Sequence, residues 1–263
     1  MTIQKLELDR QGEVWARLET VTDPELDESV TDLKFVTHVD VDARNCVHIG
    51  FRLPTYWCAA NFSFLMADDM RRAVLELPWV ANVAVVLGEH MYADTINAGL
   101  AKGLSFQDTF GAEADGGLEE LRHTFLVKAF QRRQVALLNQ LMDTGHGTAA
   151  LATLTLVELD ALDLDTEGAR LRTRYLERRD VVGPARPWAR AFVDGTGLEL
   201  TGEGLPAYVK ALRRVCVNAE FNGALCRGLL SVRFDLETPF VPRTSAPAPD
   251  LPPASDHPAE PQL

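Results

Sequence analysis

The sequence has few cysteines and no close pair of them. Among 263 residues there are four, Cys46, Cys58, Cys216 and Cys226, and Cys-x-x-Cys does not occur. Self-contained zinc and cluster sites of the usual kind use such close pairs. The spacing excludes a site of that kind, although ligands brought together by the fold stay possible. In a reducing cytoplasm we expect free thiols.

Long apolar runs and an excess of basic residues are lacking as well. No apolar run approaches the roughly 20 residues of a membrane span. The first residues lack the basic and apolar segments of a secretory signal, so we expect a cytoplasmic protein. The formal net charge is −12. This argues against binding of nucleic acid or of anionic membrane surfaces.

Familiar catalytic motifs are absent. The sequence contains no G-x-S-x-G, P-loop, dinucleotide fingerprint, H-E-x-x-H or carboxylate–histidine helix pair of the di-iron type. We therefore expect that the chain is not an enzyme.

The composition, with 46% hydrophobic and 24% charged residues, is that of a globular protein with a core. The length favours two domains. The first, at 1–104, is predicted to be α+β, with a small three-stranded sheet and helices on one face. Its helices and strands are expected, in order, as a helix at 12–20, strands at 35–41 and 47–53, a helix at 58–77 and a strand at 81–87.

The second domain, at 105–237, is predicted to be mainly helical. Helices are expected at 118–142, at 149–162 and from Pro206 to about Arg233 with a break near Arg214, an irregular arginine-rich region at 169–190, and a turn at 194–197. The tail at 238–263 has 8 prolines in 26 residues. We expect it to be disordered, with docking of a partner as polyproline II as the alternative.

Cys58 stands where the predicted helix of the first domain begins. Unpaired backbone N–H groups and the positive end of the helix dipole favour a thiolate there. The thiolate is the form that binds iron or attacks an electrophile. The alternative is a buried cysteine without a role.

Residues 10–90 resemble the small iron–sulfur assembly domain of SufT, of the eukaryotic cytosolic iron–sulfur targeting factor and of PaaD. The matching segments are Val-Thr-Asp-Pro-Glu-Leu at 21–26, Val-Thr-Asp-Leu at 30–33, the strand leading to Thr55 and Cys58, and Leu-Pro-Trp-Val at 77–80. The resemblance implies that Cys58 is the functional thiol, which contacts a metal or cluster. The residues that it places around Cys58 are Asp23, Glu25, Asp32 and Thr55.

The resemblance also implies a function. The implied function is that of an accessory maturation factor, which binds iron or an iron–sulfur cluster transiently and assists assembly of a client metalloenzyme. By analogy with PaaD, the client is a bacterial multicomponent di-iron monooxygenase. In a homodimer, two Cys58 thiolates would share one cluster. The alternatives are a metal-free assembly chaperone and, more weakly, a thiol enzyme that uses Cys58 and His90.

A second group of polar residues follows the last predicted strand. His90, with Glu89 and Asp94, lies in a loop that is expected to return towards the Cys58 helix. Its nitrogen and the carboxylate oxygens suit iron. His90 would otherwise carry protons or simply hold the loop by a hydrogen bond.

A third group lies on the last predicted helix. Asn218, Asn222 and Cys226 are spaced by four and share one face, with Glu220 and Arg227 on a neighbouring face. Polar groups along an apolar helix are expected to bond a metal, a partner or the first domain. Cys226 and Glu220 are therefore candidate metal ligands, and Asn218, Asn222 and Arg227 candidate partner contacts.

A basic island stands out in this acidic sequence. It comprises Arg170, Arg172, Arg174, Arg178 and Arg179. Two interpretations stay open: a solvated face, and a docking patch for an acidic partner.

Overall fold

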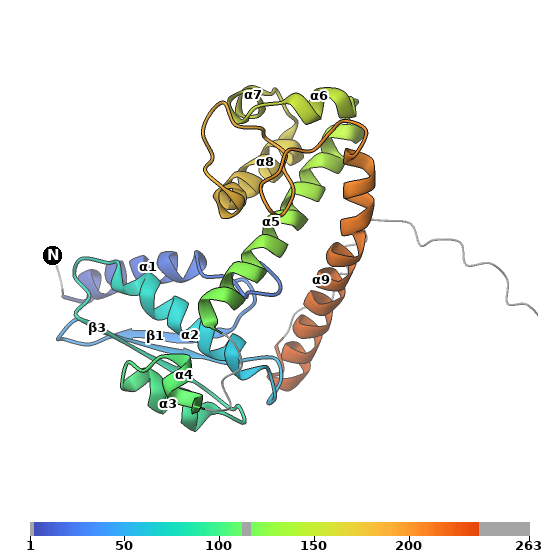
Figure 1. Ribbon diagram of the computed structural model, residues 1–263. Coiled ribbons are helices and arrows are strands. Elements are labelled where there is room, and N and C mark those ends of the chain that lie inside the picture. The colour runs from blue at the N-terminus through green and yellow to red at the C-terminus, as the bar shows by residue number, and fades with distance from the viewer. Residues whose placement is uncertain (1–2, 112–116, 237–263) are drawn as a thin grey trace, which may run out of the picture.

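The computed structural model describes residues 3–111 and 117–236, so the predicted tail at 238–263 lies outside the described residues. The chain forms a lower lobe that holds a β-sheet and an upper lobe of helices (Figure 1). No helix in the described part is both long and apolar enough to cross a bilayer. The predicted architecture, a small sheet followed by a helical region, is confirmed.

The sheet of the lower lobe has three strands: β1 (Val36–Val41), β2 (Cys46–Phe51) and β3 (Asn82–Leu87). β2 is central and pairs antiparallel with β1 and parallel with β3. Val47 and Ile49 are buried while His48 between them is exposed, which is the period of two that predicted the strand. The predicted hairpin and third strand are confirmed.

Two helices, α1 (Ile3–Glu19) and α2 (Ala60–Leu75), cover one face of the sheet (Figure 1). The other face leaves His38, His48 and Val86 exposed. Helices on one face, as predicted, therefore build the lower core. α1 starts at Ile3 rather than near Gly12.

Two shorter helices, α3 (Ala93–Ala101) and α4 (Phe106–Phe110), follow β3. The side chain of Asn97 accepts from the N–H of Leu87 and donates to its carbonyl, at 2.8 and 3.0 Å, and so holds α3 against the end of β3. The expected loop holds Glu89 and His90, but Asp94 lies in the first turn of α3. Ile96 and Leu100, four residues apart, bury one side of a helix there.

The remaining helices of the described chain lie wholly or partly in the upper lobe. They are α5 (Leu118–Asp143), α6 (Thr148–Thr153), α7 (Leu156–Ala161), α8 (Thr166–Arg179), the 3₁₀ turn η2 (Asp180–Val182) and α9 (Leu205–Arg233). Phe130, Leu137, Tyr175 and Phe192 are fully buried in its core. This core is separate from the one under the sheet.

Three local predictions for the upper lobe are wrong. The helix expected at 149–162 is two helices, because Thr155 and Glu158 form a capping box that starts α7. The region at 169–190, expected to be irregular, begins with α8, which Asp165 caps through the N–H of Gly168 at 2.6 Å. α9 runs through Arg214 without a break.

α5 and α9 each belong to both lobes. Near its start α5 packs on α2, where Phe62 and Phe125 meet edge to face with ring centroids 4.9 Å apart. Its later residue Leu137 lies in the upper core. α9 buries Leu205 in the upper core and Leu230 in the lower core. The apolar side of α9 changes partner along its length, which explains why the sequence pattern suggested a break.

Candidate functional site

Cys58 lies in the segment that joins β2 to α2. α2 begins at Ala60 with Ala59 as its N-cap, so the thiol stands just outside the helix start, close to its predicted place. The side chain is half-buried and packs against the lower core. Its Sγ is 3.0 Å from Oγ1 of Thr55. The hydroxyl and thiol that the resemblance paired are thus in direct contact.

His90 supports the same segment from the end of β3. Its Nε2 lies 2.8 Å from the carbonyl oxygen of Cys58, and its Nδ1 accepts from the N–H of Tyr92 at 3.2 Å. Since Nδ1 accepts, Nε2 carries the proton and donates. Burial lowers the pKa of His90, and the charge of Arg233 lowers it further, against the opposing effect of the Cys58 carbonyl. Both ring nitrogens are engaged with backbone, so the geometry gives His90 a positioning role beside Cys58.

The Asp-Pro-Glu loop is closed by its own first carboxylate. Oδ1 of Asp23 accepts from the backbone N–H groups of Glu25 and Leu26 at 2.9 and 2.8 Å. Burial of this carboxyl raises its pKa to about 6, although the two backbone bonds lower it. Asp23 therefore shapes its own loop and titrates near neutral pH.

α9 lies over this loop. Asn222 donates to Oε1 of Glu25 at 2.8 Å, and Arg227 forms an ion pair with Glu28 at 2.7 Å. Between these two contacts along α9 stands Cys226, half-buried against the lower core.

Electrostatics place Cys226 in the neighbourhood of the thiol site. Burial raises the pKa of Cys226 to about 12, and the negative charges of Asp23, Cys58 and Glu25 contribute in that order. Two cysteines that are far apart in the sequence therefore pack against the same core, and the charges of two carboxylates act on Cys226. The sequence predicted Cys226 and Asn222 as functional positions, and the structure brings both towards the first domain.

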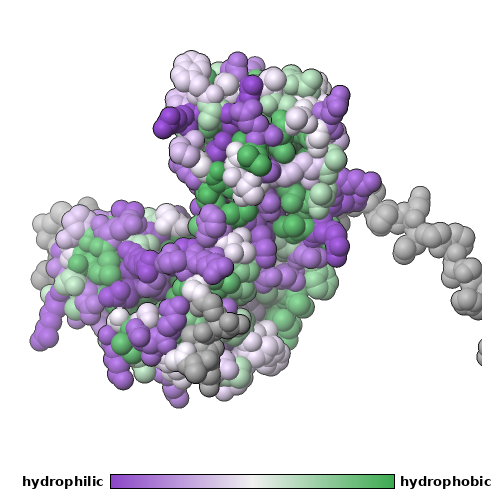
Figure 2. Space-filling model, viewed as in Figure 1, coloured by the Kyte–Doolittle hydropathy of each residue, from purple (hydrophilic) through white to green (hydrophobic). Residues whose placement is uncertain are grey.

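Arginines of α5 and α8 bind the same loop through the side chain of Asp27 and the carbonyl of Glu25. Arg133 on α5 forms a two-pronged ion pair with the buried carboxylate of Asp27, at 2.5 and 2.9 Å. Arg178 on α8 adds a contact at 3.1 Å. Arg132 donates to the carbonyl of Glu25 at 2.7 Å. Hydrophilic residues predominate where the lobes meet in Figure 2.

The basic island is thus partly used within the chain. Arg174 approaches the carbonyl of Asp27 at 3.4 Å. Arg172 donates to three carbonyls at the end of α7, including that of Asp160 at 2.7 Å. Arg170 pairs with Glu167 on the surface. Part of the island thus contacts Asp27 and its loop within the chain, and docking of a separate acidic partner stays a prediction.

Other predicted site residues lie apart from this cluster. Asp32 is exposed in the turn after the loop, and Asn218 and Glu220 are exposed on α9. Glu89 pairs with Arg233 at 3.3 Å. Within the described residues, no group of three or more His, Cys, Asp or Glu side chains is arranged to hold a metal ion.

The surface beside Cys58 is strongly apolar. Tyr56, Trp57 and Met91 are 52%, 72% and 50% exposed. The N–H of Met91 donates to the carbonyl of Tyr56 at 2.9 Å, which keeps these residues together. Exposed large apolar groups that cluster in this way are typical of interaction sites.

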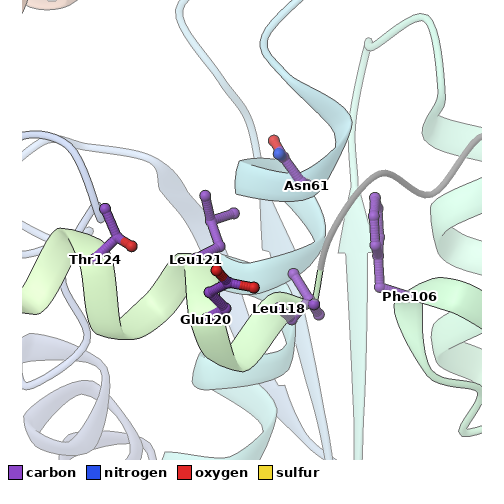
Figure 3. Close-up of a pocket in the computed structure, with 7 residues that line it drawn as sticks. Asn61, Phe106, Leu118, Glu120, Leu121 and Thr124 are labelled. Atoms are coloured by element: carbon purple, nitrogen blue, oxygen red, sulfur yellow. The ribbon is translucent and has the colours of Figure 1, made fainter.

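A hollow of about 280 Å³ lies between α2, α4 and the start of α5 (Figure 3). Its lining residues are Asn61, Phe106, Gly117, Leu118, Glu120, Leu121 and Thr124. None of them is a cysteine or histidine. This hollow is therefore not the thiol site.

The comparisons with known proteins concern the lower lobe. Residues 11–85 match a family profile described as "Iron-sulfur cluster assembly protein". A crystal structure of a domain of unknown function, DUF59, from Bacillus anthracis is similar, at 19% identity with a TM-score of 0.31, over 37% of this chain and 97% of that one. No curated protein matches the chain. The resemblance stated for the N-terminal third is confirmed by the profile, and it associates this lobe with iron–sulfur cluster assembly.

Sequence reasoning missed Asp27 and the two arginines of α5, Arg132 and Arg133, that bind its loop. Asp27 directly follows the matched Asp-Pro-Glu-Leu, and Arg132 and Arg133 interrupt the apolar pattern of α5. A buried charge requires a partner of opposite sign. The two adjacent arginines in an apolar helix therefore indicate that a buried carboxylate lies in another part of the fold.

Proposed function

We propose that this protein is an accessory factor that binds iron or an iron–sulfur cluster transiently through Cys58 and assists assembly of a metalloenzyme. The observation that carries the proposal is the position of Cys58. It is half-buried beside Thr55, in the lobe that matches the assembly family, and it acts electrostatically on Cys226, as Asp23 and Glu25 also do.

The residues fit such a cargo by their donor chemistry. Thiolates bind iron and its clusters, and carboxylates are suitable additional ligands for iron. Cys58 is the primary donor, Cys226 a second one, and Glu25 is oriented by Asn222 at 2.8 Å. A small and open set of donors holds a metal weakly. Weak holding suits hand-over to a client better than storage.

The client is recognised in this proposal by the surface next to the thiol. Tyr56, Trp57 and Met91 offer exposed aromatic and thioether groups. Aromatic residues and Met are enriched at protein interfaces. We propose a metalloenzyme subunit as the client, and a bacterial multicomponent monooxygenase is the candidate that the resemblance implies.

The test replaces Cys58 by Ser and reconstitutes the full chain anaerobically with iron and sulfide. Absorbance and metal content are expected to show cluster formation in the wild type, at least a tenfold loss in Cys58→Ser, and a smaller loss in Cys226→Ser. Cys46→Ser is the matched control, because Cys46 is also a half-buried cysteine of the lower lobe. Equal cluster content in Cys58→Ser and Cys46→Ser would reject the proposed role.

The exposed surface also favours a second function, that of a metal-free assembly chaperone. In that case Cys58→Ser leaves client assembly intact. Trp57→Ala would abolish client binding in either case, because it removes the largest exposed group of the client surface. Since Trp57 is 72% exposed, the substitution should leave the fold intact. Cys58→Ser therefore distinguishes the two functions, while Trp57→Ala tests the client surface that both require.

A further inference from the structure

α9 is apolar on the side that faces away from the molecule. Five large side chains are exposed there, and we call them the outer stripe: Val217 52%, Phe221 67%, Leu225 49%, Leu229 38% and Val232 86%. Gly223 and Leu230, on the opposite side of the helix, are buried. Hydrophobic residues are visible at the edge that α9 forms in Figure 2. A helix with two apolar sides normally has both of them covered.

The outer stripe has the spacing of a helix pair. Phe221, Leu225, Gly228 and Val232 are separated by four, three and four residues, which is the alternation of a coiled-coil seam. Gly228 is the small member. A Cβ built on it meets no atom within 4 Å, so the seam has an open hollow at this position.

We propose that a second copy of this chain covers the outer stripe, with the two α9 helices antiparallel about a two-fold axis. The stripe complements itself in that arrangement. Phe221 packs opposite Val232 of the partner subunit, and Leu225 fills the hollow at Gly228 of the partner subunit. A two-fold axis makes each of these contacts twice.

Charge also favours a second copy. The chain has a net charge of −12, yet the face of α9 that bears the stripe contains no charged residue between 217 and 232. Two copies therefore meet there without opposing like charges directly.

This arrangement separates the two thiol sites. Cys226 faces the lower core on the inner side of α9, while the outer stripe faces the partner. Both α9 helices would stand between the two Cys58 residues. Each site would therefore receive its cargo alone, and two Cys58 thiolates would not share one cluster.

The test is sedimentation equilibrium of the full chain over a range of concentrations. We expect a dimer that dissociates on dilution, because one helix against one helix buries less than the roughly 1,200–2,000 Å² of a standard stable interface. Leu225→Glu should weaken dimerisation at least tenfold. Leu198→Glu is the matched control, since Leu198 is 68% exposed in the other lobe and should leave the dimer unchanged.

Gly228→Leu gives the sharper result. It enlarges the apolar surface, and a Cβ at this position meets no atom within 4 Å, so we expect the fold to tolerate it. It nevertheless should weaken the dimer at least tenfold, because it fills the hollow that receives Leu225 of the partner subunit. Circular dichroism confirms that each variant is folded.

Several results would overturn the proposal. A monomer at every concentration, an unchanged dimer in Leu225→Glu, or a tighter one in Gly228→Leu would each exclude this pairing. A monomeric full chain that dimerises only after removal of 237–263 would identify that segment as the cover. None of these outcomes bears on cluster binding by Cys58.

Discussion

The two segments that carry the candidate site residues are held very differently. The acidic loop at 22–28 is bound by charged side chains from α5, α8 and α9, with Asp27 at their centre. The thiol segment at 54–59 has fewer ties, chiefly the Thr55–Cys58 contact and the bond from His90 to the Cys58 carbonyl. The helical lobe thus fixes the carboxylates, while the lower lobe alone positions the thiol.

The difference indicates a division of labour. The loop with buried charges has one arrangement, because a displaced Asp27 would leave Arg133 unpaired inside the protein. The thiol segment can shift at the cost of a few neutral hydrogen bonds. A carrier that releases its cargo requires this second kind of support around its donor atom.

The largest effect on stability is expected from Asp27→Asn. The substitution removes a buried charge, and asparagine tolerates the positive φ of 54° at this position. Loss of one member of a buried ion pair costs about 3–5 kcal/mol of unfolding free energy. Urea denaturation measures it, with exposed Asp32→Asn expected to stay within about 0.5 kcal/mol of the wild type. Equal values for both variants would contradict the role given to Asp27.

Asp23→Asn is expected to stabilise the protein, by an amount that depends on pH. The pKa of Asp23 is raised from 3.8 to about 6, so its folded form binds protons more tightly than its unfolded form. Its contribution to stability is present below pH 3.8 and is lost as the pH rises through 6. An amide keeps the bonds to the loop without the charge.

The unfolding free energy of the Asp23→Asn variant should therefore be higher than that of the wild type by roughly 3 kcal/mol at pH 8. Near pH 4 the two free energies should be equal. Urea denaturation at the two pH values checks this. A difference that does not change with pH would show that the carboxyl is not the cause.

His90→Ala tests the thiol segment. It leaves the carbonyl of Cys58 and the N–H of Tyr92 without their partner, at a cost of about 1–3 kcal/mol. Because burial lowers the pKa of His90, its contribution is present above the unfolded pKa of about 6.5 and lost as the pH falls below it. The deficit of the variant should shrink between pH 7 and pH 5. Exposed His48→Ala should show no such trend.

The smallest effect on stability is expected from Thr55→Val, at about 1 kcal/mol or less. Its measurable consequence lies in the thiol, since Sγ of Cys58 loses a contact of 3.0 Å. The rate at which a thiol reagent labels Cys58 should change at least threefold, while that of Cys46 in the same sample stays constant. An unchanged rate at Cys58 would remove Thr55 from the site.

The fold was predictable where one period dominates the sequence. The alternation around Val47 and Ile49 and the apolar stripe of α2 correspond to simple burial on one side. α8 escaped prediction because its arginines contact buried carbonyls and Asp27, so its pattern of polarity does not follow exposure. The contact between Asn222 and Glu25 spans 197 residues, and no local pattern reports it. Cys58 and Thr55, only three residues apart, could be placed together from the sequence.

α5 has a consequence for how the molecule comes apart. One uninterrupted helix from Leu118 to Asp143 supplies side chains to the packing of both lobes. Unfolding of either lobe would remove the packing of α5 against that lobe. An isolated helix has little stability of its own in water, so α5 would then unfold as well. Heating should therefore give a single calorimetric transition, and a fragment cut before α5 should not retain the cooperativity of the whole chain.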